Sequence, residues 1–148
     1  STLVMALIRK GGLSWLSVGD SRICLWRGGG LIQLNRDHDF HHDLTLLALQ
    51  GDMTLREADQ DPRRENLTSF IGRGFPRKVE WNPEPVLLLP GDKVVLMSDG
   101  VYRALSQQEL ARCLRGGASE AARALRGAVM EKRLPQQDNF TAVVLEEM

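Results

Sequence analysis

The first part of the chain alternates between short apolar runs and glycine-rich connections. The runs have the length, the branched and aromatic residues and the spacing that are typical of β-strands. They are Leu3 to Ile8, Leu13 to Val18, Ile23 to Arg27 and Leu31 to Leu34. Because the connections are only a few residues long, successive strands are expected to pair antiparallel. The pattern therefore predicts a meander at the start of the chain.

After residue 35 the apolar residues no longer recur every second position. They recur instead at intervals of three and four residues. From Phe40 this spacing predicts a helix that Gly51 ends. Asp52 or Thr54 is suited to cap a second, short helix. The residues that follow are polar and irregular, so we interpret residues 51–66 as a surface flap.

The second half of the chain carries further strand and helix signals. Leu67 to Ile71 reads as a strand, and Val86 to Leu89 and Lys93 to Ser98 read as a hairpin joined by a tight turn. Ser106 and Glu109 have the spacing of a capping box and predict a helix that ends near Leu114. The remaining elements are an amphipathic helix over Ala118 to Val129 and a terminal strand over Phe140 to Leu145. The fold class predicted is α+β with antiparallel sheets.

Composition limits the possible functions. The chain has 148 residues, 43% apolar and 26% charged, which indicates one ordered domain or a part of one. Lys plus Arg equals Asp plus Glu at 19 each, so no nucleic-acid partner is expected. No apolar run reaches the roughly 20 residues of a membrane span. Cys24 and Cys113 are not spaced like metal ligands, so we interpret them as reduced thiols of a cytoplasmic protein.

A carboxylate follows the most apolar strand of the chain. The apolar run Val94 to Met97 stops at Ser98-Asp99-Gly100, so Asp99 is expected directly after the end of a buried strand. Such a rigidly aimed carboxylate suits a metal ion or acid/base chemistry. The alternative is that Asp99 and Gly100 simply form a turn.

Two more aspartates have a similar setting. Asp20 lies between two predicted strands, and Asp138 lies just before the last strand. All three carboxylates are therefore expected at the rim of a sheet, although their spacing alone does not show that they converge. Oxygen ligands without paired His or Cys favour Mg²⁺ or Mn²⁺ over zinc.

Several short motifs occur together and in a particular order. They are Ser1-Thr2-Leu3, Val18 to Arg22, Leu34 to His38, Leu67 to Gly72, Pro90-Gly91-Asp92, Ser98-Asp99-Gly100 and Asp138-Asn139. In this order and spacing the chain resembles the type 2C family of metal-dependent protein serine/threonine phosphatases. The short flap is most similar to that of the compact bacterial members.

The resemblance implies a sandwich of two antiparallel sheets with helices on both outer faces and a two-metal centre at one end. It assigns Asp99 and Asp138 to the two-metal centre, with Mn²⁺ or Mg²⁺, and Asp20 to an additional, weaker third metal. A metal-activated water would attack phosphoserine or phosphothreonine directly. The substrate would be a phosphoprotein that a serine/threonine kinase has modified.

The chain also departs from the family pattern. It lacks the phosphate-binding arginine and the Asp-Gly-His-Gly segment of the family's first half, and Tyr102-Arg103 replaces the usual Trp-Asp. We therefore expect the C-terminal portion of a catalytic domain, without its N-terminal strands and helices, that binds metal weakly and is inactive alone. It would pair with the missing portion or with a swapped chain. For His38 we expect packing or hydrogen bonding rather than catalysis.

A non-catalytic binding or regulatory module on a phosphatase-like scaffold is the alternative function. The three rim carboxylates Asp20, Asp99 and Asp138 argue against this alternative, because a scaffold has no need of them.

Overall fold

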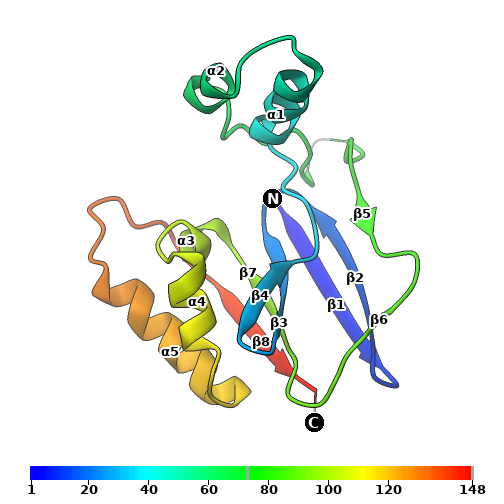
Figure 1. The fold of residues 1–148 in the computed structure, drawn as a ribbon, viewed down its shortest axis with the longest axis vertical. Helices are drawn as coiled ribbons and strands as arrows, with labels where there is room; N and C mark the ends of the chain where they lie inside the picture. Colours follow the sequence, from blue (N-terminus) through cyan, green and yellow to red (C-terminus); the bar gives the residue numbers. More distant parts are fainter. Residues whose placement is uncertain (73, 148) are drawn as a thin grey trace.

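The computed structural model describes residues 1–72 and 74–147 and contains two antiparallel sheets that face each other (Figure 1). In the first sheet β2 is central, pairing with β1 on one side and with β5 and β6 on the other. The second sheet has the order β4-β3-β7-β8. The strands of the first sheet are β1 (Leu3–Arg9), β2 (Gly12–Val18), β5 (Glu80–Trp81) and β6 (Val86–Leu87). Those of the second are β3 (Arg22–Arg27), β4 (Gly30–Gln33), β7 (Lys93–Met97) and β8 (Ala142–Glu146).

Five helices accompany the sheets in the described part of the chain: α1 (Phe40–Gln50), α2 (Leu55–Gln60), α3 (Asp99–Tyr102), α4 (Gln107–Cys113) and α5 (Ala118–Glu131). Figure 1 shows α4 and α5 against the second sheet, whereas α1 and α2 stand together beyond the end of the sandwich. None of these helices is long and apolar enough to cross a membrane.

Two apolar clusters hold the layers together. Between the sheets lie side chains such as Leu13, Ile23 and Val94. Between the second sheet and its helices lie Val95 and Leu125, among others. Strand β7 contributes to both clusters, which explains why its sequence is an unbroken apolar run rather than an alternating one. These layers confirm the α+β antiparallel sandwich.

The expected hairpin over Val86 to Leu89 and Lys93 to Ser98 is wrong. Strand β6 pairs with β2 in the first sheet, whereas β7 lies between β3 and β8 in the second. The turn between them crosses from one sheet to the other because Leu88 and Val94 both bury their side chains in the space between the sheets. Likewise, the expected meander is divided into two hairpins, since β2 and β3 also belong to different sheets.

The expected strand over Leu67 to Ile71 is also wrong. Leu67 makes only an isolated bridge to Asp39. No ladder continues from it, because the hydroxyl of Ser69 bonds both the N–H and the carbonyl of Lys78, at 2.9 and 2.7 Å. The Ser69 side chain thus satisfies the backbone groups of Lys78 that a neighbouring strand would otherwise bond.

Candidate metal site

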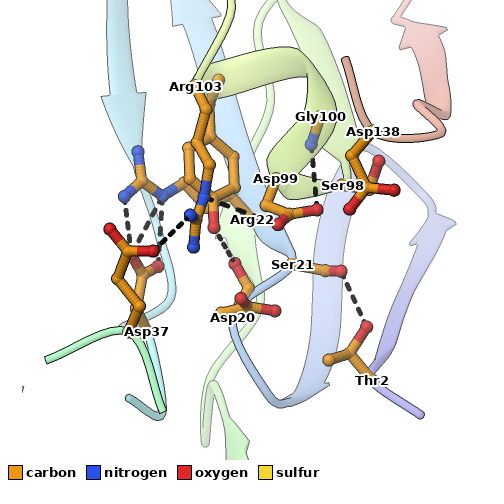
Figure 2. A network of polar contacts seen from close by, with 12 residues as sticks. Thr2, Asp20, Ser21, Arg22, Asp37, Ser98, Asp99, Gly100, Arg103 and Asp138 are labelled. Carbon is orange, nitrogen blue, oxygen red and sulfur yellow. Dashed lines mark hydrogen bonds and ion pairs between the residues drawn. The ribbon is translucent and has the colours of Figure 1, made fainter. Parts of the chain in front are cut away.

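The three candidate aspartates lie at one end of the second sheet. Asp20 precedes β3, Asp99 follows β7 and Asp138 precedes β8. Strands β3, β7 and β8 are adjacent and antiparallel, with Met97 opposite both Arg22 and Ala142. In Figure 2 Asp99 lies between Asp20 and Asp138. The tertiary structure therefore brings together the three carboxylates that lie far apart in the sequence.

Asp20 and Asp99 are close enough to repel each other. The pKa of Asp20 is raised, first by burial and then by the negative charge of Asp99. Two carboxylates in this arrangement are a favourable environment for a cation, because a positive charge relieves both effects. The pair therefore indicates a cation-binding edge.

Backbone contacts orient Asp99 and Asp138. Asp99 Oδ1 accepts a hydrogen bond from the N–H of Gly100 at 2.9 Å, and Asp138 Oδ1 accepts one from Asn139 at 2.7 Å. The two segments are also tied to each other, since the amide of Gln137 donates to the carbonyl of Gly100 at 3.1 Å. Both carboxylates therefore have defined directions.

Gly100 is needed for close packing rather than for a turn. Asp99 begins the short helix α3, and a Cβ at position 100 would lie 2.5 Å from the carbonyl oxygen of Asn139. Glycine thus allows the segment that carries Asp138 to approach the segment that carries Asp99. The expectation that Gly100 lets the chain turn is replaced by this contact.

The backbone beside Asp20 is held by a stacked pair. The phenol of Tyr102 donates to the carbonyl of Asp20 at 3.1 Å. Arg22 lies over the Tyr102 ring at 3.6 Å from its centroid and makes a forked ion pair with Asp37, at 2.6 Å for the shortest contact. Arg22 is therefore structural, and it positions the loop of Asp20.

Sequence reasoning did not identify Arg103 as part of this site. Its guanidinium lies 2.9 Å from Glu65 and 3.5 Å from Asp99. Arg103 and Glu65 also line an open cavity of about 480 Å³, together with residues such as Asp37, His41 and Tyr102. The replacement of Trp-Asp by Tyr102-Arg103 was the available signal, but nothing in the sequence shows which residue Arg103 reaches.

The described residues fit part of a divalent-metal site. Their oxygen donors suit Mg²⁺ or Mn²⁺. Among residues 1–72 and 74–147, no three His, Cys, Asp or Glu side chains are grouped closely enough to hold a metal by themselves. The carboxylates therefore supply some ligands of a site rather than a closed coordination shell.

His38 supports the Asp20 loop by hydrogen bonding. It is 5% exposed, and its Nδ1 accepts a hydrogen bond from the N–H of Gly19 at 3.2 Å. This acceptor role requires the neutral ring, with the proton on Nε2. Burial lowers the pKa of His38, and this effect outweighs the opposing attraction of Glu80. These contacts agree with the structural role expected for His38.

Stability is expected to fall as the pH drops below the usual histidine pKa of 6.5. The unfolded chain binds the proton more readily than the folded one, so the loss begins at the unfolded pKa and grows toward the lower, folded one. His38→Asn keeps an acceptor but cannot titrate, and it should lose less stability than the wild-type protein between pH 7.5 and 5.5. Urea unfolding at several pH values measures this difference. His42→Asn is the control, and equal pH dependence in all three proteins would contradict the prediction.

Comparison with known proteins identifies the family. No protein-family model matches the chain. Protein phosphatase PhpP of Streptococcus pneumoniae is 34% identical over 109 residues, which are 72% of this chain and 41% of PhpP. The S. agalactiae serine/threonine phosphatase superposes with a TM-score of 0.80 at 28% identity, covering 99% of this chain and 59% of that chain.

A further similar structure is the catalytic domain of the phosphatase PstP in complex with two manganese ions. Its TM-score is 0.65 at 27% identity, and the match covers 98% of this chain and 59% of PstP. The chain belongs to the PP2C-type serine/threonine protein phosphatases, whose members are enzymes. It spans about half the length of the relatives it matches.

Proposed function

We propose that this chain is the C-terminal portion of a metal-dependent phosphatase domain that hydrolyses phosphoserine and phosphothreonine in proteins. The observation that supports the proposal is the placement of Asp20, Asp99 and Asp138 at the same end of one sheet, in a sandwich of the PP2C type. A regulatory scaffold without catalysis would not need three carboxylates at the same edge.

The residues have separate roles in this proposal. Asp99 and Asp138 would hold divalent cations of a two-metal centre, and Asp20 would serve a weaker third position. Bound Mn²⁺ or Mg²⁺ supplies a water of lowered pKa and neutralises charge on the phosphoryl oxygens. The chain itself orients the carboxylates through Gly100 and Asn139. Further metal ligands and the phosphate-binding group would come from the rest of the domain.

The substrate that we propose is a phosphoprotein made by a serine/threonine kinase. The open cavity of about 480 Å³ that Arg103 lines leaves room for the residues that flank a phosphoserine. We also infer a cytoplasmic location, which the two free thiols of Cys24 and Cys113 support.

The test is a phosphatase assay on this chain alone and on the complete domain that includes the upstream portion. We expect Mn²⁺-dependent release of phosphate from a phosphoserine peptide by the complete domain, inhibition by EDTA, and little or no activity of the chain alone. A complete domain that binds the peptide but does not hydrolyse it with Mn²⁺ or Mg²⁺ would support the regulatory scaffold instead.

We propose that the upstream portion of the domain packs against the outer face of the first sheet. Met5, Leu7 and Trp81 are 56%, 61% and 60% exposed on the outer face of this sheet, which the described helices leave uncovered. An apolar face of this kind favours association with another protein surface. The same face would otherwise promote pairing between copies of the chain.

We expect the isolated chain to self-associate and the double variant Met5→Thr, Leu7→Thr to do so clearly less. Light scattering at increasing protein concentration measures the difference. Leu49→Thr is the matched control, because Leu49 is 74% exposed on α1, away from this face. A chain that stays a clean monomer over the whole concentration range would contradict the proposed partner surface.

A further inference from the structure

Arg103 connects the flap with the candidate metal site. Its Nη1 lies 2.9 Å from Glu65 Oε2, at the end of the flap, and its Nε lies 3.5 Å from Asp99 Oδ2. Figure 2 shows the guanidinium directed toward the same edge as Asp20 and Asp99. The side chain is about half exposed. A single positive charge is therefore shared between a flap carboxylate and a candidate metal ligand.

Arg103 is the cation that is available to the Asp20–Asp99 pair. Figure 2 shows Asp20 next to Asp99 at the same edge. Arg22 lies nearby, but its guanidinium is occupied by the fork to Asp37 and by stacking on Tyr102. Arg64 lines the same cavity and contacts Glu65 and the carbonyl of Asp59 instead. Among the described residues, only Arg103 forms an ion pair with Asp99.

We propose that Arg103 is a built-in counter-ion of the Asp20–Asp99 pair that competes with a divalent cation for these two carboxylates. This inference rests on the proposed phosphatase function, and it requires that Asp99, in addition to its role in the two-metal centre, faces the weaker, third cation beside Asp20. A guanidinium and a divalent cation cannot both lie against the same oxygen without strong repulsion. Arg103 must therefore leave Asp99 when a cation binds there.

Glu65 determines how strongly Arg103 competes. While Glu65 holds part of the guanidinium, the contact with Asp99 stays long, at 3.5 Å against 2.9 Å for Glu65. Without the charge of Glu65, the guanidinium is free to pair fully with Asp99. Removing Arg103 and neutralising Glu65 should consequently change cation affinity in opposite directions, and the effect of Glu65 should depend on Arg103.

Mn²⁺ binding by the complete domain tests the proposal. Electron paramagnetic resonance of free Mn²⁺ and calorimetry give the number of bound ions and their affinities without any assay of activity. In Arg103→Gln, the weakest Mn²⁺ is expected to bind roughly 10- to 100-fold more tightly, and the tighter ions, which have further ligands, should gain clearly less. Arg103→Lys keeps the charge and should stay near the wild-type protein.

Two further variants sharpen the test. Arg64→Gln removes an equal charge from the same cavity without touching Asp99, and it should shift the weakest affinity only a few-fold. Glu65→Gln should weaken this site in the wild-type background and have a clearly smaller effect beside Arg103→Gln.

An Arg103→Gln protein whose Mn²⁺ affinities match those of the wild-type protein, while both hydrolyse the phosphopeptide, would overturn this inference alone. A gain in Arg64→Gln as large as that in Arg103→Gln would also overturn it, because it would reflect overall charge rather than competition. Failure of the wild-type domain to bind Mn²⁺ at all would overturn the proposed function as well.

Discussion

Replacement of Asp99 by asparagine is expected to lower Mn²⁺-dependent phosphatase activity of the complete domain by about 10³-fold. Losing even an indirect partner of a metal ligand typically costs 10- to 100-fold, so loss of a ligand charge should cost more. The fold should tolerate the change. An amide oxygen can still accept the hydrogen bond from Gly100, and the ion pair with Arg103 is partly exposed.

Steady-state kinetics with a phosphoserine peptide over a Mn²⁺ titration measure this effect, with thermal unfolding of the metal-free protein beside it. Asp52→Asn is the control, because Asp52 is an exposed aspartate of the flap. Its activity should stay within about twofold of the wild-type value. Full activity of Asp99→Asn at saturating Mn²⁺ would remove Asp99 from the metal centre.

Leu125→Ala is expected to destabilise the protein by about 2–5 kcal/mol. Leu125 is 1% exposed and lies on α5 in the cluster that joins this helix to the second sheet. Truncation removes buried apolar surface and leaves a cavity that neighbours such as Leu114 and Val95 fill only in part. Because β7 contributes to the same cluster, the loss also loosens the strand that precedes Asp99.

Urea unfolding of the complete domain, followed by circular dichroism, measures this loss. Met130→Ala is the matched control on the same helix, since Met130 is 60% exposed and should cost less than about 0.5 kcal/mol. Equal losses in the two variants would show that helix propensity or the unfolded chain, rather than core packing, dominates at both positions.

Local sequence signals were sufficient to predict the helices that cover the second sheet. Ser106 and Glu109 form the predicted capping box at the start of α4, and the apolar spacing from Ala118 predicted α5 to within two residues of its end. These features depend on contacts three and four residues apart. The sequence contains all the information that such contacts need.

Pairing between distant strands could not be predicted in the same way. Val86 to Leu89 and Lys93 to Ser98 have the strand-forming residues and the turn of a hairpin, yet they lie in different sheets. The sheet that each strand joins depends on which long-range partners bury the most apolar surface. A short run of strand residues has no signal for that choice.

The sequence by itself predicted Asp20, Asp99 and Asp138 as candidate metal ligands and placed each of them near the end of a strand. Motif order was enough to indicate the family, which the comparisons confirmed. Only the tertiary structure decided that the three carboxylates lie at the same end of one sheet, because strands far apart in the chain are placed side by side by hydrogen-bond pairing and core packing. It also decided that Arg103 reaches Asp99 and Glu65, since a long side chain takes its partner from whatever folding brings within its reach.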